Sequence, residues 1–208
     1  MEDVLEVYQR PYDVRFPKLC MDEGSKQLLA HTRKPIEMEA GEAERVDYEY
    51  ERKGVCSVFV AMEPETGACQ VRVSKRRTKK DWALFLREVM DVYYPQAEKV
   101  VLVMDNLNTH TPSSFYEVFE PAEARRLTEK LEIHYTPKHG SWLNMAEIEL
   151  SILARQCLSE RFPTLEVLTA QVDAWQRERN QAQVTINWRF TTEDARLKLK
   201  RLYPSLDG

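Results

Sequence analysis

A short apolar run that ends in an acid is the feature that most constrains how this chain can fold. Residues 100–104 read Val-Val-Leu-Val-Met, and Asp105 follows directly. A β-branched run of this length predicts a strand covered on both faces, as in the middle of a parallel or mixed sheet. An acid at the carboxyl end of such a strand lies where open α/β sheets bind their ligands. Asp105 suits a turn or helix cap equally well, so the rest of the chain must decide.

Composition indicates a soluble globular protein. The chain has 208 residues, of which 43% are hydrophobic and 31% charged, enough for one domain with a sizeable core. No apolar run approaches the roughly 20 residues of a membrane span, and the acidic N-terminus lacks the pattern of a signal peptide. Cys20, Cys56, Cys69 and Cys157 include no Cys-x-x-Cys pair, which argues against a zinc site. The first three fall in apolar segments, so we expect reduced core cysteines and a cytoplasmic protein.

Charge is unevenly distributed along the chain. The net charge of −4 does not suggest a nucleic-acid binder. Residues 75–80 nevertheless read Lys-Arg-Arg-Thr-Lys-Lys, and Arg196, Lys198, Lys200 and Arg201 form a second basic cluster. Each cluster fits either a solvated surface or a phosphate-binding patch.

The order of the predicted elements indicates an α/β fold, with a mixed sheet flanked by helices. Residues 25–52 are polar and without period, so they read as a long loop of the kind that is often functional. Three early strands are followed by an alternation of strands and helices, which favours a mixed sheet with helices on its faces. The strands are expected at 16–21, 54–62, 68–74, 100–104 and 131–135, and the helices at 1–10, 78–94, 113–119, 121–130, 142–158, 165–179 and from 192.

Acids follow two of these strands, and a third acid begins a helix. Asp22 and Asp105 end strands, and Glu147 or Glu149 lies on the helix expected over 142–158. Three carboxylates at one sheet edge repel one another unless divalent cations lie among them. Two Mg²⁺ ions about 3.5–4 Å apart assist an in-line phosphoryl displacement. At about 100° per residue, Glu147 and Glu149 flank the apolar stripe of their helix on opposite sides, so geometry does not choose between them.

Three stretches of the chain resemble the blocks of a DDE transposase. They are Cys20–Glu23, Leu102–His110 and Tyr135–Glu147. An Asp-Asn-x-x-x-His block followed by a Pro-x-x-x-x-x-Leu-Asn-x-x-Glu block is similar, more narrowly, to bacterial insertion-sequence transposases of the mariner-like superfamily. The resemblance extends from Tyr8 to Pro204.

The resemblance implies a ribonuclease-H-like fold, with three antiparallel strands followed by two parallel ones. It implies a catalytic and metal-binding triad of Asp22, Asp105 and Glu147, since the family's third acid stands three residues after Leu-Asn. Two Mg²⁺ or Mn²⁺ ions are the implied cofactors. The implied activity is cleavage of double-stranded DNA at transposon ends and joining of the freed 3′-hydroxyl to target DNA, by a homodimer at the bacterial nucleoid. Glu23 is expected to support the metal ligands rather than join them, and His110 to hold the loop after Asp105 by hydrogen bonding.

A second set of residues is expected to contact DNA. Basic side chains neutralise phosphates, and aromatic faces stack on unpaired bases. Trp142 also suits a core position, since it begins an apolar stripe, and the basic run also suits a solvated surface. The expected contacts are Arg76, Arg77, Lys79, Lys138, His139, Trp142 and Asn144.

The chain departs from the family pattern at two places. Gly24 stands where the pattern has Thr, which predicts a looser turn after the first acid. Residues 1–15 read as a linker helix from an N-terminal DNA-binding region that relatives carry, before a catalytic domain at 16–180 and a basic tail at 181–208. Two alternatives therefore stay open. One is a ribonuclease-H-like nuclease without strand transfer, and the other is a truncated, non-catalytic copy that regulates full-length transposases.

Overall fold

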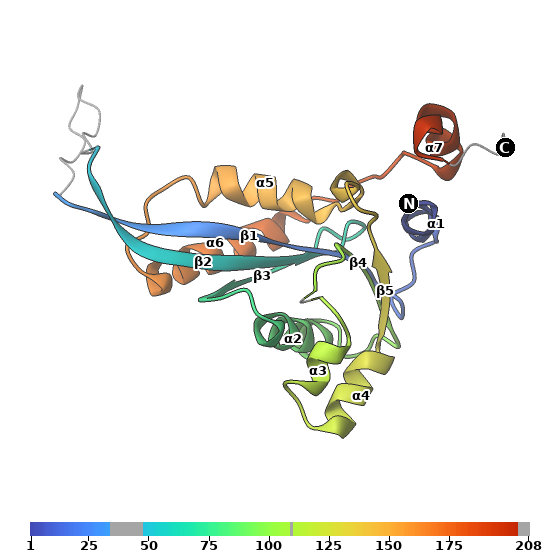
Figure 1. Ribbon diagram of the computed structural model, residues 1–208, viewed down its shortest axis with the longest axis horizontal. Helices are drawn as coiled ribbons and strands as arrows, with labels where there is room; N and C mark the ends of the chain where they lie inside the picture. The colour runs from blue at the N-terminus through green and yellow to red at the C-terminus, as the bar shows by residue number, and fades with distance from the viewer. Residues whose placement is uncertain (34–47, 109, 204–208) are drawn as a thin grey trace.

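One five-stranded mixed sheet organises the computed structural model, which describes residues 1–33, 48–108 and 110–203 (Figure 1). The strand order is β3-β2-β1-β4-β5. The first three strands are antiparallel, and the last two run parallel to β1, as the sequence predicts. The strands are β1 (Lys18–His31), β2 (Tyr50–Met62), β3 (Cys69–Ser74), β4 (Val100–Met104) and β5 (Leu131–Tyr135).

Helices cover both faces of this sheet (Figure 1). One face carries α5 (Ala146–Gln156) and α6 (Leu165–Ala182), and the other carries α2 (Lys79–Glu88), α3 (Ser113–Tyr116) and α4 (Pro121–Glu129). The first helix, α1 (Glu2–Gln9), contacts the last, α7 (Thr192–Lys198). Helix α2 continues as a π-helix over Val89–Tyr93, and short 3₁₀ turns lie at Ser141–Leu143 and Lys200–Leu202. No helix in the described part of the chain has the length and apolarity to cross a membrane.

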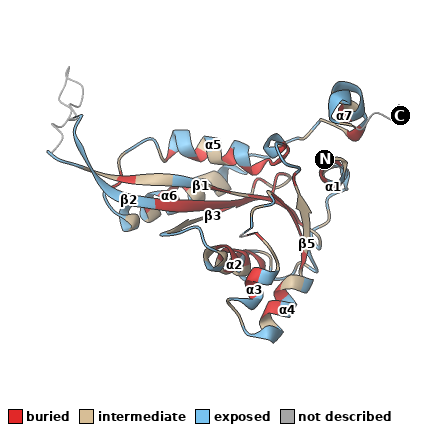
Figure 2. Cartoon of the chain, in the orientation of Figure 1, coloured by how far each residue is buried: buried red, intermediate tan, exposed pale blue. Residues whose placement is uncertain are grey.

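The sheet separates two apolar cores, and strand alternation assigns each residue to one of them. Strand β4 is buried throughout, as its apolar run predicts, and Figure 2 shows buried residues through the middle of the sheet. On β1, Cys20 belongs to the core under α5 and α6, whereas Met21 belongs to the core over α2 to α4. Successive side chains of a strand point to opposite faces of the sheet. Asp22 therefore points to the same face as Cys20, and Glu23 to the same face as Met21.

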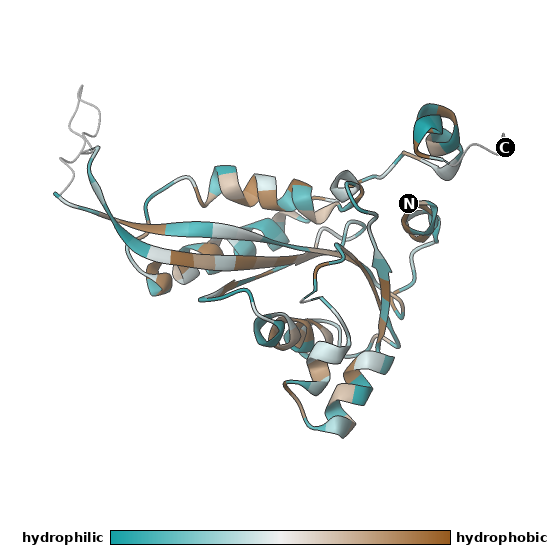
Figure 3. Ribbon diagram, in the orientation of Figure 1, coloured by the Kyte–Doolittle hydropathy of each residue, from teal (hydrophilic) through white to brown (hydrophobic). Residues whose placement is uncertain are grey.

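Strands β1 and β2 are both longer than the sequence predicts. β1 runs on past Asp22 to His31, and β2 begins at Tyr50, so the loop expected over 25–52 is wrong at both ends. The two strands pair from Cys20–Met62 out to His31–Tyr50. Figure 3 shows that the outer part of β2 is hydrophilic, whereas β1 there mixes hydrophilic and hydrophobic residues. This part of the hairpin therefore has no regular apolar alternation from which a strand could be predicted. The rest of the predicted loop, residues 34–47, lies outside the described residues.

The helix expected from Trp142 begins four residues later, at Ala146. Asn144 interrupts it with an extended backbone (ψ 106°), and its side-chain oxygen accepts a hydrogen bond from the N–H of Ala146 at 3.2 Å. The apolar stripe of the helix is otherwise as predicted, because Leu153 and Cys157 are buried.

Candidate active site

Asp22 and Asp105 lie on neighbouring parallel strands. Cys20 stands opposite Val103, and both acids come two residues further along their strands. β4 ends at Met104, so Asp105 follows a strand end as predicted. Asp22 lies within β1 rather than at its end, which corrects the prediction. The two acids still meet at the carboxyl end of β4, where open sheets bind ligands.

Glu147 brings a third carboxylate to this place from the first turn of α5. Burial raises the pKa of Asp22 to about 6, helped by the charges of Asp105, Glu23 and Glu147. The N–H of Glu23 donates to Asp22 Oδ1 at 2.8 Å and opposes that rise. The site therefore concentrates the negative charge of several carboxylates around Asp22.

The other candidate glutamate, Glu149, has a different environment. Its side chain is 1% exposed and accepts two hydrogen bonds from Arg179, at 2.6 and 2.8 Å. Glu147 is exposed. The structure therefore separates the two residues that helix geometry left equal, since the carboxylate of Glu149 is committed to an ion pair.

His110 joins Asp105 to Glu23. Its Nδ1 lies 2.6 Å from Asp105 Oδ1, and its Nε2 lies 2.9 Å from Glu23 Oε2. Burial by itself lowers the pKa of His110, but the hydrogen bond to Asp105 and the charges of the two carboxylates outweigh it and raise the pKa to about 9. The side chain is therefore an imidazolium at neutral pH. This confirms that His110 holds the loop after Asp105 by hydrogen bonding.

Residues distant in sequence surround this histidine. The buried Trp82 on α2 stacks on its ring, with centroids 5.9 Å apart and planes at 21°. The hydroxyl of Tyr135 donates to the backbone carbonyl of His110 at 2.9 Å. Arg77 Nη1 lies 3.4 Å from Glu23 Oε1, the carboxylate oxygen that His110 does not contact. The sequence did not predict these contacts. Its only signals for them are the adjacent acids Asp22 and Glu23 and the histidine of the Asp-Asn-x-x-x-His block.

Asn144 does not lie where a DNA contact needs it. It is 1% exposed, its amide nitrogen donates to the carbonyl of Met21 at 2.8 Å, and its oxygen accepts from Ala146. Because both ends of the amide are used inside the protein, the prediction of a DNA contact is corrected to a structural role. Asn144 ties the start of α5, and with it Glu147, to the strand that carries Asp22.

A cleft of about 520 Å³ opens beside Asp105. The exposed Lys138 and His139 line this cleft. The same two residues, together with Trp142, also line an adjoining groove of about 280 Å³. Trp142 is 43% exposed, so the expectation of a core position is wrong. It stacks on Trp188 with centroids 6.3 Å apart. These three predicted DNA-binding side chains therefore gather on one side of the candidate site.

The predicted basic contacts differ in what they touch. Arg76 and Arg77 are both exposed, and Arg77 also pairs with Glu23. Lys79 pairs with Glu117. In the C-terminal cluster, Arg196 pairs with Glu2 at 2.7 Å and Lys198 pairs with Asp194 at 2.8 Å.

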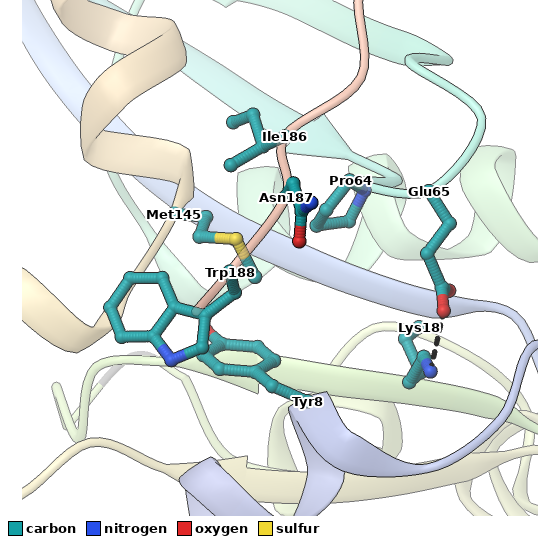
Figure 4. Close-up of a pocket in the computed structure, with 8 residues that line it drawn as sticks. All are labelled: Tyr8, Lys18, Pro64, Glu65, Met145, Ile186, Asn187 and Trp188. Carbon is teal, nitrogen blue, oxygen red and sulfur yellow. Dashed lines mark ion pairs between the residues drawn. The ribbon is translucent and has the colours of Figure 1, made fainter. Parts of the chain in front are cut away.

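A separate cavity of about 140 Å³ lies between α1 and the segment before α7 (Figure 4). It holds the ion pair of Lys18 and Glu65, at 2.6 Å, beside the rings of Tyr8 and Trp188. Lys18 precedes Asp22 by four strand residues, roughly 13 Å at about 3.3 Å per residue. This cavity is therefore distinct from the carboxylate site.

The carboxylates fit a hard divalent cation by donor type and charge. Asp22, Asp105 and Glu147 supply the oxygen ligands that Mg²⁺ and Mn²⁺ favour. The raised pKa of Asp22 marks negative charge that a cation would relieve. Within residues 1–33, 48–108 and 110–203, no three His, Cys, Asp or Glu side chains are drawn together closely enough to enclose an ion. Binding would therefore have to draw the carboxylates closer together.

Comparison with known proteins identifies the family and the fold. The family model described as DDE superfamily endonuclease matches residues 17–169. The Mos1 mariner paired end complex with Mn is similar in structure, with a TM-score of 0.56 and 15% identity over 87% of this chain and 55% of that chain. The Mos1 strand transfer complex gives 0.56 and 16%, over 87% and 54%, and the paired end complex with Mg gives 0.55 and 16%, over 88% and 56%. No curated protein matches the sequence.

The structural likeness confirms the ribonuclease-H-like fold that the sequence resemblance implies. This chain spans little more than half the length of the Mos1 chains. The family match spans most of the 208 residues and includes Asp22, Asp105 and Glu147. The chain therefore belongs to the DDE superfamily of endonucleases.

Proposed function

We propose that residues 16–180 form the catalytic domain of a DNA transposase, which cuts DNA at transposon ends and joins the freed 3′-hydroxyl to target DNA. The observation that carries this proposal is that Asp105 and Glu147 lie near enough to Asp22 for their charges to add to the rise that burial causes in its pKa. Membership of an endonuclease family and a fold shared with Mos1 strand transfer and paired end complexes support it. From the resemblance to bacterial insertion-sequence transposases, which act on two transposon ends, we propose that the active form is a homodimer at the nucleoid of a bacterial cell.

Asp22, Asp105 and Glu147 would hold two divalent cations, Mg²⁺ or Mn²⁺. When bound, such ions supply an activated water nucleophile and stabilise the leaving oxygen. The protein's own residues orient these ligands. His110 fixes one oxygen of Asp105, and Asn144 fixes the start of the helix that carries Glu147.

The DNA would lie along the cleft beside Asp105. Arg76, Lys79 and Lys138 are suited to phosphates by charge, and these contacts set position rather than sequence preference. His139 and Trp142 offer faces for an unpaired base next to the cut. The groove that Trp142 lines adjoins the cleft of Asp105, which supports this arrangement.

The test is cleavage and joining of end-labelled duplex DNA with Mg²⁺ or Mn²⁺. The protein is compared with Asp105→Ala and with Arg125→Ala, which changes an exposed residue of α4. We expect cut and joined products from the unmodified protein and from Arg125→Ala, and none from Asp105→Ala. Cleavage without joining would support a nuclease instead. Inactivity with both metals, on duplexes carrying the element's own ends, would support the non-catalytic alternative.

A further inference from the structure

Glu23 is a buried acid whose charge is balanced from two sides. Its side chain is 1% exposed, and neither of its oxygens has a hydrogen bond of good geometry. His110 Nε2 lies 2.9 Å from Oε2, and Arg77 Nη1 lies 3.4 Å from Oε1. Charge therefore holds this carboxylate in place. His110 and Glu23 form a buried pair, in which losing a partner is costly, and the half-exposed Arg77 closes it from the solvent side.

These contacts form a continuous chain from the loop before α2 to the end of β4. Arg77 contacts Glu23, Glu23 contacts His110, and His110 contacts Asp105. The side chains of His110 and Glu23 are 0% and 1% exposed, so the link between them is closed to water. Without Arg77, the carboxylate of Glu23 would keep one of these two contacts, the ring of His110, with Asp22 adjacent in the strand.

Arg77 differs from its neighbours in the basic run. The next residue, Thr78, is the N-cap of α2 and exchanges capping hydrogen bonds with Asp81. Ser74, at the end of β3, donates to the same carboxylate at 2.5 Å. The loop that carries Arg77 is therefore anchored on both sides. Arg76 and Arg77 are both exposed, and the contact with Glu23 is what distinguishes Arg77.

We infer that Arg77 is a positioning residue for the cleavage reaction rather than a phosphate contact. Through Glu23 and His110 it holds Asp105 in the orientation that cation binding requires. This inference rests on the proposed function. Partners that orient metal ligands in this way typically change metal affinity or activity by about 10-fold to 100-fold when they are removed.

The first test separates kcat from KM in DNA cleavage. We expect Arg77→Ala to lower kcat by about tenfold or more and to raise the Mg²⁺ concentration for half-maximal cleavage, with little change in KM for DNA. Arg77→Lys retains the charge and should recover part of kcat. Arg76→Ala should instead raise KM, and Arg125→Ala, which breaks an exposed pair with Glu129, should match the unmodified protein.

The second test measures Mn²⁺ binding by calorimetry without DNA, so its readout does not depend on activity. We expect Arg77→Ala to weaken Mn²⁺ binding by about tenfold, and thermal unfolding checks that the variant is folded. If Arg77→Ala does not fold, Arg77→Gln and Arg77→Lys supply the same comparison. Unchanged Mn²⁺ affinity with a raised KM would overturn the inference and make Arg77 a DNA contact.

The two proposals fail in different ways. An unmodified protein that binds Mn²⁺ but cuts no DNA contradicts the proposed function, while the calorimetric comparison still decides the role of Arg77. An unmodified protein that binds no Mn²⁺ overturns both.

Discussion

At the scale of single residues, Asp22 is held in an environment that disfavours its charge. Its pKa of about 6 lies above the ordinary value of 3.8 because of burial and three neighbouring carboxylates. Between these values the folded protein binds more protons than the unfolded chain. The free energy of unfolding of the metal-free protein should therefore fall as pH rises from about 4 to 6, by up to about 3 kcal/mol from this residue.

Asp22→Asn isolates this effect from other titrating groups. In EDTA at pH 7 we expect the variant to be more stable than the unmodified protein by about 1–3 kcal/mol, and near pH 4 the difference should vanish. Urea unfolding at the two pH values measures both. Equal stability at pH 7 would mean that the neighbouring charges do not act on Asp22 as described.

Substituting the two glutamates of α5 should affect different properties, cleavage for Glu147 and stability for Glu149. Glu147→Gln changes an exposed side chain, so we expect lost cleavage with unchanged stability. Glu149→Gln leaves the mostly buried Arg179 without its counter-charge, which should lower the free energy of unfolding by about 3–5 kcal/mol. Urea unfolding and cleavage assays on both variants decide. Full activity in Glu147→Gln would remove this residue from the triad.

Gly24 is a place where the sequence-based expectation was wrong for a physical reason. It pairs with Val58 inside β1, so no turn follows the first acid. A Cβ atom there would meet Leu150 Cδ2 at 3.6 Å, an ordinary contact. Gly24→Ala should therefore raise the free energy of unfolding by about 0.5–1 kcal/mol, measurable by urea unfolding. A loss of stability would show that α5 packs more tightly on β1 than this distance indicates.

At the scale of elements, the sequence predicts those strands whose apolar pattern is local. β4 and β5 lie where their patterns place them. The outer half of β1 could not be predicted, because Ser25, Lys26 and Gln27 carry no apolar alternation and become strand only through pairing with β2. The same holds for the candidate site. The sequence motifs predict its acids, but not the contacts of Arg77 and Trp82 with the site, because these contacts join segments distant in sequence and leave no local pattern.

The edge of the sheet at β3 is closed by side chains of α6. Asn180 exchanges two hydrogen bonds with the backbone of Cys69 on β3, at 2.7 and 2.9 Å, and Gln176 accepts from the N–H of Val71 at 2.7 Å. These amides occupy the place of a sixth strand. An open edge strand is otherwise a template for aggregation.

Asn180→Ala tests this closure. The variant leaves the N–H and C=O of the buried Cys69 without partners, at a cost of roughly 1–3 kcal/mol, and should aggregate more readily on heating. Thermal unfolding with light scattering measures both effects. Gln181→Ala, on the exposed side of the same helix, is the matched control. Equal behaviour of the two variants would contradict a protective role for Asn180.

At the scale of the whole molecule, the first and last elements meet beside the candidate site. Glu2 and Arg196 pair, and Trp188 packs on both Tyr8 and Trp142, with centroids 5.2 and 6.3 Å away. The C-terminal segment therefore braces α1 and the turn that leads into α5.

The overall charge requires that any DNA binding be local. The net charge is −4, so attraction to phosphates must come from positions such as Arg76 and Lys80, both exposed in the loop and first turn at α2. Each phosphate contact contributes about 0.9 to the slope of log K against log salt concentration. The double variant Arg76→Ala, Lys80→Ala should therefore bind duplex DNA more weakly and lower that slope by about 2.

A matched double variant separates position from total charge. Lys99→Ala with Arg125→Ala also removes two exposed cations, so both double variants carry −4 − 2 = −6. If DNA lies against the basic loop, only the first variant changes the slope, because screened charges beyond about 10 Å contribute little at 0.1 M salt. Equal losses in both would mean that DNA is attracted by the overall field of the protein. Fluorescence anisotropy across a salt series distinguishes the two outcomes.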